Sequence, residues 1–525
     1  MSTTTGNTPA ASMQATPKDW IPGLIENGKY DATAGFIIFL IALPLSLAIS
    51  LASGAPAIAG VITAVVGGIL GALLSGSHLT INGAAAGLIV IVLGAVQAVG
   101  YRGALAIGLI CGGLQILAGL VKAGKLTNMF PLHVVHGMLA GIGMIVMAKQ
   151  IHVALGVTVK GGMVETIAAI PSSFVGMVPS VALIGGISLL IMILWPRLGA
   201  VIKFAKVVPA PLVVAIVAVL LAQVLNLDKK YLVSVPLNFM DSFAFPDFSK
   251  AAEFVFWKFV IIYLLVASLE SLLTASAVDK MDPWKRRSNM NRELVGKGVA
   301  NALSAAIGGL PMIAEVVRSS ANVMNGARTR WSNVFHGVFL LIAVAAFPQI
   351  LNMIPVAALA GMLVFIGFRL AHPKEFVHAL HIGKEELFFM VVTAAIVLTV
   401  DLLWGVIIGF LVAVAVNVFR GGVAGFFKAG TTVRTTEATV TLKLSGPIGF
   451  NNYMGIRSTL DALPKGKALT IDLSAVTFID HTVRERLHDF ELEYAGDGGT
   501  VGYSGIAALQ SSSHHAYSAL VRNRA

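Results

Sequence analysis

Fourteen apolar segments follow one another between residues 33 and 419, and most of them are long enough to cross a membrane. A helix needs about 20 apolar residues to cross the hydrocarbon core of a bilayer, and soluble domains do not repeat such runs. Hydrophobic residues make up 56% of the chain and charged residues only 12%. The sequence therefore predicts an α-helical polytopic membrane protein with 14 transmembrane segments.

Basic residues indicate the orientation of these segments. If the N-terminus is cytoplasmic, the cytoplasmic loops carry fifteen Lys and Arg residues, whereas the opposite loops carry six. This asymmetry follows the positive-inside rule, and an even number of segments returns the C-terminus to the cytoplasm. We expect a plasma membrane protein, in bacteria an inner membrane protein. Residues 1–30 are polar and lack the apolar region of a cleaved signal, so the first segment is expected to direct insertion.

The formal net charge of +11 raises the question of a nucleic-acid partner. Before residue 434, 28 Lys and Arg stand against 17 Asp and Glu, and from there onward each sign has nine. The excess belongs to the membrane part, so we expect membrane lipid around the chain and no nucleic acid. The single cysteine, Cys111, leaves no intrachain disulfide to form.

Segment 10, at 312–325, contains two charged residues, Glu315 and Arg318, in a stretch that otherwise belongs in lipid. Each charge costs about 2.5–3.5 kcal/mol at a helix centre on insertion scales, so both side chains should face a partner or a wet cavity. A Gly-Gly-Leu-Pro sequence at 308–311 interrupts the apolar run before them. We expect a half-length helix that begins near Pro311 and ends near Asn325.

Segment 3, at 83–98, is also short and follows a polar break. It stands seven segments before segment 10 and is therefore oppositely oriented, which predicts two inverted halves, 31–226 and 254–420, whose broken helices meet near the midplane. The start of a half-helix exposes backbone N–H groups and a positive dipole end, and both attract an anion. The alternative is that both segments are Gly- and Ala-rich packing helices.

Segment 8, at 254–278, carries Glu270 well inside its apolar length, and Thr274 lies one helical turn further on the same face. An intramembrane acid of this kind indicates a functional site, and the alternative is a structural carboxylate bonded to a neighbouring helix. His133, His136 and Lys149 lie near the ends of segment 5. They are interpreted as snorkelling or packing residues.

The composition changes after residue 420. A basic, glycine-rich linker is expected over 421–433 and a small α/β domain over 434–525, because strand-like and helix-like stretches alternate there. Strands are expected at 436–446, 468–480 and 500–506, and helices at 452–463 and 481–495. The domain has no phosphate-binding loop, metal-ligand spacing or catalytic triad pattern, so we expect no enzyme activity.

Several stretches, in this order, resemble the sulfate permease (SulP) family of anion transporters, which includes prestin and pendrin in animals and bicarbonate transporters in cyanobacteria. They are ALPLSLAISLASGAPAIAGVITAVVGG in segments 1 and 2, HGMLAGIGMIV in segment 5, SLESLLTASAVDKM in segment 8, and GGLP followed by Arg318, Asn322 and GART in segment 10. IDLSAVTFIDHT at 471–482 resembles the core of the STAS domain that ends most family members.

The resemblance implies a substrate-carrying core and a gate that move by an elevator-like transition, usually in a homodimer. It implies an anion between the starts of segments 3 and 10, with Arg318 supplying positive charge near Gly83, Ala84, Ala85, Ile313, Ala314, Glu315 and Val316. Glu270 and Thr274 match the acid and threonine that help hold sodium in bicarbonate-transporting relatives. A sodium ion is the one cofactor considered.

The chain also departs from the family pattern. Glu270 is one methylene longer than the aspartate of the sodium motif, and residues 315–317 stand where relatives commonly carry small or hydroxyl residues. Asp480, His481, Thr482 and Val483 replace a Ser or Thr pair followed by Gly. For Thr482 the sequence leaves two interpretations, phosphorylation and a role in the folded turn.

We expect a secondary transporter of a small inorganic anion, bicarbonate or sulfate, coupled to sodium or protons. Glu270 and Glu315 would share one cavity of low dielectric and repel each other, so one of them is a candidate proton carrier. The alternatives are a dicarboxylate or nucleobase-like transporter on the same fold, and a membrane anion sensor that signals through the STAS domain.

Overall fold

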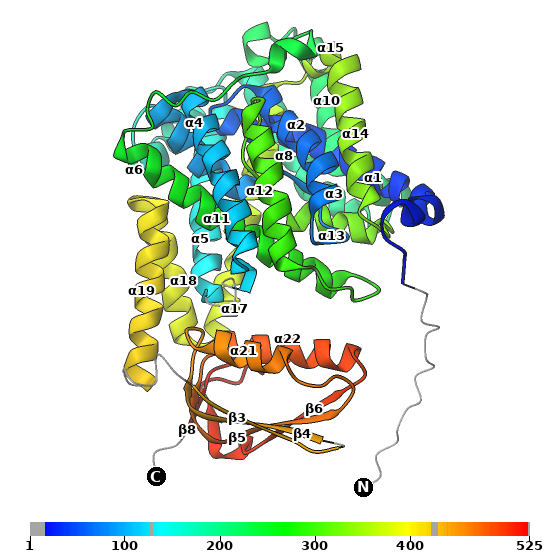
Figure 1. Cartoon of the computed structure of the whole chain (residues 1–525). Helices are drawn as coiled ribbons and strands as arrows, with labels where there is room; N and C mark the ends of the chain where they lie inside the picture. Colours follow the sequence, from blue (N-terminus) through cyan, green and yellow to red (C-terminus); the bar gives the residue numbers. More distant parts are fainter. Residues whose placement is uncertain (1–15, 126–129, 422–428, 438, 523–525) are drawn as a thin grey trace.

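The computed structural model describes residues 16–125, 130–421, 429–437 and 439–522 of the chain. A large helical domain stands above a small domain of strands and helices (Figure 1). Within the described residues, eight helices are long and apolar enough to cross a membrane, and two shorter apolar helices accompany them. The predicted helical polytopic fold is confirmed, whereas the number of fourteen spans stays a prediction.

The first half of the helical domain runs from α1 to α10 (Figure 1). Long helices form here because a segment surrounded by apolar groups must satisfy its backbone hydrogen bonds internally. Asp19 caps the first helix, since its side chain accepts a hydrogen bond from the Trp20 N–H group. The elements are α1 Trp20–Ala52, α2 Ala57–Val66, α3 Ala72–Leu74, β1 Asn82–Ala84, α4 Ile89–Leu120, α5 Leu132–Ala154, α6 Met163–Ala168, α7 Ile170–Val175, α8 Pro179–Leu198, α9 Lys203–Val207 and α10 Ala210–Val224.

The second half runs from α11 to α19 and again contains one three-residue strand between helices. Helix α13, which follows this strand, has only nine residues. The elements are α11 Phe254–Met281, α12 Met290–Ala306, β2 Met312–Ala314, α13 Val316–Met324, α14 Trp331–Ala346, α15 Pro348–Leu351, α16 Val356–Leu370, α17 Pro373–Ile382, α18 Lys384–Thr399 and α19 Leu402–Gly421.

Helix α4 contains a turn at Gly100, where φ is 79°. Side chains with a Cβ rarely adopt this conformation, so a glycine is favoured where the helix kinks. The turn separates the residues before Gly100 from those after it, and these two arms correspond to predicted segments 3 and 4. A 3₁₀ turn at Ala86–Leu88 leads from strand β1 into the first arm.

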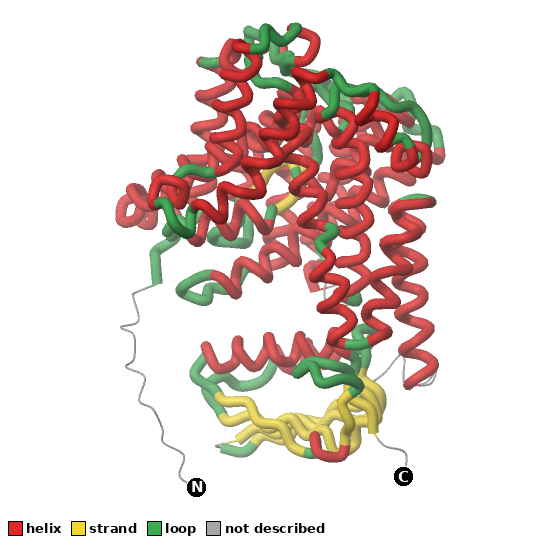
Figure 2. The backbone as a smooth tube through the Cα atoms, turned by 180° about the vertical axis from the view of Figure 1, so that it is seen from behind, coloured by secondary structure: helices red, strands yellow, loops and turns green. Residues whose placement is uncertain are grey.

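Strands β1 and β2 pair in antiparallel register and so join the two halves of the chain at the centre of the helical domain (Figure 2). Asn82 lies opposite Ala314, and Gly83 lies opposite Ile313. All six residues of this ribbon are buried. The two broken segments thus satisfy part of each other's backbone hydrogen bonds inside the protein, which is where irregular backbone is tolerated at membrane depth.

The helices pack into two groups. We call α1–α4 with α11–α14 the core bundle, in which α4 packs on α12 and α1 packs on α14. We call α5–α10 with α16–α19 the outer bundle, in which α5 packs on α16 and α18. Glycines permit the closest crossings: a Cβ on Gly298 would lie 2.6 Å from the Gly112 carbonyl oxygen, and one on Gly143 would lie 2.5 Å from that of Gly367.

The C-terminal domain is a six-stranded sheet with the order β3-β4-β5-β8-β7, in which β6 also pairs with β5. Helices α21 and α22 cover the face of the sheet that is turned toward the helical domain (Figure 1). The elements are β3 Gly430–Thr435, β4 Thr439–Ile448, α21 Tyr453–Asp461, β5 Ala468–Ile479, α22 His481–Gly496, β6 Thr500–Ser504, β7 Leu509–Ser511 and β8 Leu520–Arg522. The expected small α/β domain is confirmed.

Three boundaries in the structure differ from those that the sequence suggested. Helix α1 begins at Trp20, so the N-terminal region at 1–30 already contains its first turns. Strand β3 occupies 430–433 of the predicted linker, because it pairs with β4, while 422–428 lie outside the described residues. The half-length helix begins at Val316 rather than near Pro311, because residues 312–314 are extended in the ribbon.

Candidate functional site

Helix α13 turns its polar side chains inward. Arg318, Ser319 and Asn322 are buried, whereas Val316 and Val317 are 46% and 53% exposed. Ser319 accepts a hydrogen bond from the Ile81 N–H group at 2.9 Å, and Asn322 donates one to the Leu79 carbonyl oxygen at 3.0 Å. These bonds fix α13 to the chain that leads into β1.

Arg318 lies over the β1–β2 ribbon. Its Nη2 donates to the Ala84 carbonyl oxygen at 3.2 Å, and its Nε lies 2.8 Å from Glu315 Oε2. Its Nη1 lies 2.7 Å from the position that a Cβ on Gly83 would take, so a larger residue there would displace the guanidinium. Nη1 has no hydrogen-bond partner among the described residues. A buried guanidinium with a free donor attracts an anion.

Glu315 joins the two broken segments. Its backbone N–H group donates to the Ile81 carbonyl oxygen at 2.9 Å, and its carboxylate accepts the Ala86 N–H group. The side chain of Glu315 is 15% exposed, whereas that of Arg318 is 1% exposed. Glu315 is therefore the more exposed side chain of the ion pair.

Glu270 reaches the same place from α11. Both of its carboxylate oxygens lie 2.6 Å from the position of a Cβ on Gly87, and its Oε1 has no hydrogen-bond partner within the described part of the chain. Glu270 and Glu315 thus contact two neighbouring residues, Gly87 and Ala86. Thr274 is buried one turn further along α11, and no hydrogen bond joins it to Glu270 among the described residues.

The structure brings most of the predicted site residues together. Five positions of the ribbon and its adjoining turn meet Glu315 and Arg318 at one point, which Glu270 also reaches; these positions are Gly83, Ala84, Ala85, Ile313 and Ala314. The predicted arrangement of two helix starts needs correction, since Ile313 and Ala314 belong to a strand. The Ala314 N–H group donates to the Ser271 side chain and so does not lie at a helix start. Val316 is the first helical residue of α13 and faces outward.

Sequence reasoning missed an ion pair behind the ribbon. Lys297 Nζ lies 2.8 Å from Glu293 Oε1 and also donates to the Asn82 side-chain oxygen, while Glu293 accepts the Gly76 N–H group at 3.0 Å. The sequence did contain a signal for this pair, because Glu293 and Lys297 stand four residues apart. Glu293 lies just before the ninth apolar segment, and Lys297 lies inside it.

Two further polar residues support the ribbon or lie near Arg318. The Asn301 amide accepts the Met312 N–H group at 2.7 Å and donates to the Met312 carbonyl oxygen at 3.3 Å. His336, on α14, is fully buried, and its Nε2 has no partner among the described residues. Neither residue shows a pattern in the sequence that separates it from a packing residue.

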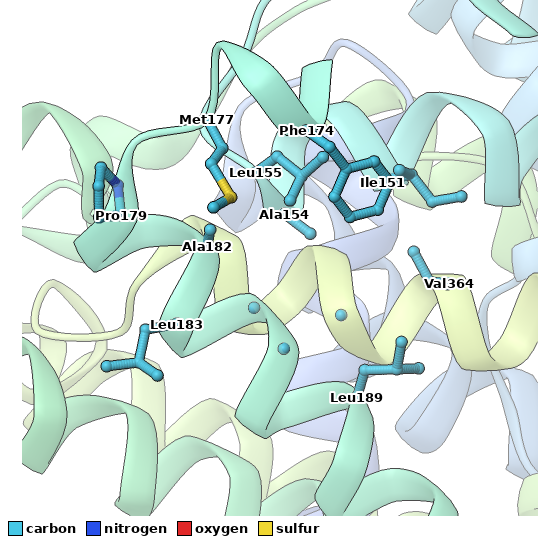
Figure 3. Close-up of a pocket in the computed structure, with 13 residues that line it drawn as sticks. Ile151, Ala154, Leu155, Phe174, Met177, Pro179, Ala182, Leu183, Leu189 and Val364 are labelled. Atoms are coloured by element: carbon cyan, nitrogen blue, oxygen red, sulfur yellow. The ribbon is translucent and has the colours of Figure 1, made fainter. Parts of the chain in front are cut away.

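An apolar cavity of about 490 Å³ lies elsewhere, among α5, α7, α8 and α16 of the outer bundle (Figure 3). Ile151, Phe174, Met177 and Leu189 line it together with other apolar residues and glycines. None of the residues around it carries a charge, so it has no group that would bind or select an ion.

A second buried polar cluster lies where the C-terminal domain meets the outer bundle. His133 Nδ1, on α5, lies 2.9 Å from Glu386 Oε2, on α18, and the ring of His133 lies 5.1 Å from that of His481, on α22. His133 is 2% exposed and therefore does not snorkel. It is a contact between the two domains.

The first residues of α22 titrate abnormally because they are buried in this cluster. Burial lowers the pKa of His481 to about 4, although the Glu386 carboxylate nearby acts in the opposite direction. Burial raises the pKa of Asp480 to about 7, against the effect of the Val483 and Phe450 N–H groups that it accepts at 2.7 and 2.6 Å. Thr482 is 3% exposed in the first turn of α22, which supports its role in the fold.

The other end of α22 contacts the core bundle. Lys280 Nζ, at the end of α11, lies 2.7 Å from Asp489 Oδ1. Arg287, in the following loop, lies 3.4 Å from Asp497 and 3.8 Å from Glu493. One helix of the C-terminal domain thus touches both bundles of the membrane domain.

Comparison with known proteins gives a consistent result. The model of the sulfate permease family matches residues 29–393. A putative sulfate transporter of Bacillus subtilis, YvdB, is 27% identical over 469 residues, which cover 86% of this chain and 86% of the relative. The bicarbonate transporter BicA of Synechocystis is 25% identical over 425 residues, which cover 77% of this chain and 74% of BicA.

Solved structures share the fold. The transmembrane domain of a cyanobacterium bicarbonate transporter BicA matches with a TM-score of 0.63 and 25% identity, over 74% of this chain and 97% of that chain. SLC26A9 matches with a TM-score of 0.68 and 16% identity, over 94% of this chain and 86% of its own. The second match extends over more of this chain than the membrane domain alone.

Proposed function

The chain belongs to the sulfate permease family of anion transporters, and we propose that it carries a small inorganic anion, bicarbonate or sulfate, by secondary active transport. One observation carries this proposal: Arg318 is buried over a ribbon formed by the two broken segments, and one of its donors is free. The names of the relatives, a putative sulfate transporter and a bicarbonate transporter, support the same two substrates.

The proposed substrate site consists of the β1–β2 ribbon, Glu315 and Arg318. Small side chains at Gly83, Ala84 and Ala85 let an ion approach the backbone closely. The start of α13 adds a positive dipole end and the guanidinium adds a full charge. A charge-assisted hydrogen bond between an arginine and an oxyanion is about twice as strong as a neutral one.

The coupling ion is proposed to be sodium or a proton. Glu270 supports both, because a buried carboxylate with a free oxygen either binds a cation or takes up a proton. Thr274 is buried on the same face of α11 and offers a hydroxyl oxygen as a further sodium ligand.

An elevator-type transition is proposed for the movement. The substrate residues all belong to the core bundle, and the outer bundle packs mainly within itself, so one bundle can move against the other. We further propose a homodimer in the plasma membrane with both termini in the cytoplasm, which follows the loop charges and the family resemblance.

One alternative has specific support. Two carboxylates, Glu270 and Glu315, flank the site, and carboxylates accept hydrogen bonds from N–H groups. This arrangement also fits a nucleobase-like substrate. Uptake of labelled bicarbonate, sulfate, succinate and uracil into liposomes that contain the purified protein, under imposed sodium and proton gradients, tests these functions together. Uptake of uracil without uptake of any anion would refute the proposed substrates, and uptake of succinate alone would replace them by dicarboxylates.

A further inference from the structure

The candidate site contains more acidic than basic side chains. Arg318 is paired with Glu315, and Glu270 lies against Gly87 on the other side of the same turn. Lys297, the other buried cation that touches the ribbon, is already paired with Glu293. An anion that enters the site therefore meets one arginine whose charge is balanced by a carboxylate, together with a second carboxylate nearby.

The side chain of Glu315 is also more exposed than that of Arg318, at 15% against 1%. The exposed residues that follow it, Val316 and Val317, offer no polar side-chain atoms. Glu315 Oε2 lies 2.8 Å from Arg318 Nε, so a substrate that binds this guanidinium also lies near the Glu315 carboxylate and can contact it. An ionised carboxylate only accepts hydrogen bonds, so this contact is favourable only for a substrate that carries a donor.

Small inorganic anions differ in this respect. Bicarbonate retains one O–H group near neutral pH, whereas sulfate and nitrate carry only acceptor oxygens. An O–H group that meets a carboxylate forms a short, strong hydrogen bond. The oxygen atoms of sulfate or nitrate would instead face the carboxylate as a second set of acceptors and repel it. Repulsion of this kind excludes an unsuitable ligand from a site.

We propose that Glu315 determines specificity: it accepts the O–H group of a protonated oxyanion, bicarbonate, while Arg318 holds the negative charge, and it excludes oxyanions that have no O–H group. This inference rests on the proposed function, since it assigns a selectivity to the same site. Of the two anions proposed above, it selects bicarbonate.

The experiment compares three anions in liposomes that contain the full-length protein. Nitrate is the decisive probe, because it has the charge and the planar shape of bicarbonate but lacks its O–H group. We expect sulfate and nitrate to inhibit the uptake of labelled bicarbonate only at concentrations at least about 100-fold above the KM for bicarbonate. Nitrate inhibition as strong as that by unlabelled bicarbonate would overturn the proposal without use of any variant.

Two variants then test the residue. Glu315→Gln supplies an amide donor of the same size, and Glu315→Ser supplies a hydroxyl group and keeps the test possible if one variant does not fold. In the variant that folds, we expect inhibition by sulfate and nitrate to improve at least 10-fold relative to bicarbonate. Unchanged relative inhibition would show that Glu315 does not select the substrate. Glu253→Gln, at the exposed start of α11, is the matched control.

The failure of this inference is distinct from a failure of the proposed function. If the wild-type protein carries bicarbonate, sulfate and nitrate alike, anion transport stands and the role of Glu315 is refuted. If the wild-type protein takes up none of the three above the level of empty liposomes, the proposed function itself is refuted, and the role of Glu315 is refuted with it.

Discussion

Lys297 and Glu293 form an ion pair from which water is excluded: Nζ lies 2.8 Å from Oε1, and neither side chain has any exposed area. Lys297 donates a hydrogen bond to the Asn82 side chain, and Glu293 accepts one from the Gly76 N–H group. The pair therefore connects α12 to the chain on which β1 begins.

The first prediction concerns the stability of this pair. Lys297→Met leaves the Glu293 carboxylate buried without a counter-charge, which should lower the free energy of unfolding by about 3–5 kcal/mol. The double variant Glu293→Gln with Lys297→Met removes both charges and should recover most of that loss. Thermal unfolding in detergent measures both effects. Equal destabilisation by the single and double variants would show that the charges do not matter as a pair.

The second prediction concerns Arg318. Arg318→Gln removes a charged donor from the proposed site, and such hydrogen bonds contribute about 1.5–3 kcal/mol, so apparent anion affinity should fall about 10-fold or more. Protein yield should change less than affinity. Arg369→Gln, at an exposed position on α16, is the control. Uptake kinetics that are unchanged by Arg318→Gln would remove this residue from the site.

The third prediction concerns coupling. If a cation held at Glu270 and Thr274 drives transport, Glu270→Gln should abolish stimulation by an inward sodium gradient. If protons drive transport, Glu315→Gln should flatten the dependence of uptake on an imposed pH gradient. Flux assays in liposomes separate these outcomes. Full activity of both variants, with indifference to both gradients in the wild type, would mean that transport is uncoupled.

The fourth prediction concerns pH and the contact between the domains. Burial lowers the pKa of His481 from its ordinary value of 6.5 to about 4. As the pH falls, the histidine of the unfolded domain therefore takes up a proton at a higher pH than that of the folded domain. The stability that this neutral histidine contributes is complete above pH 6.5 and is lost as the pH falls toward 4. The loss amounts to about 3 kcal/mol.

His481→Asn keeps a donor toward the Tyr517 carbonyl oxygen, which His481 Nδ1 approaches at 2.7 Å, but it does not titrate. The difference in stability between the wild type and this variant should therefore shrink as the pH falls from 6.5 to 4. Burial raises the pKa of Asp480 to about 7, so the stability that protonated Asp480 contributes is lost as the pH rises. This effect is present in both the wild type and the variant, so it cancels when the two are compared. Hydrogen exchange of α22 gives the measurement, and a difference that is constant with pH would contradict the assignment.

The fifth prediction concerns the C-terminal domain, which has balanced charge. Truncation after residue 428 should leave anion binding intact and change the transport rate or the expression level. It removes His481 from the His133–Glu386 pair and Asp489 from Lys280, so contacts to both bundles are lost together. Anion binding to the folded, truncated protein tests this, and loss of binding would assign the domain a direct part in the site.

The sequence predicted the helices well and the ribbon badly, for physical reasons. Apolar length alone locates a span, because lipid leaves the backbone no alternative. A three-residue strand has no such signal. The proline at 311 favoured a helix start there, but the Asn301 side chain takes the Met312 N–H and carbonyl groups and holds that residue extended.

The site residues divide in the same way. Glu315, Arg318 and Glu270 could be found because a charge in lipid needs a reason. The groups that Glu315 and Arg318 contact could not be predicted. The Ala86 N–H group and the space over Gly83 belong to a segment more than 200 residues earlier in the chain. The contact between His133 and His481 was missed for the same reason, because each histidine alone is typical of a packing residue.

The pairing of β1 with β2 also determines when the binding site can be completed during synthesis. The Ile81 N–H group donates to the Ser319 side chain, which is synthesised 238 residues later. At a synthesis rate of about 5–20 residues per second, this interval lasts roughly 10–50 s. During that time the residues around Asn82 have entered the membrane without their backbone partners. The first half is therefore inserted without a complete binding site until the second half has been synthesised.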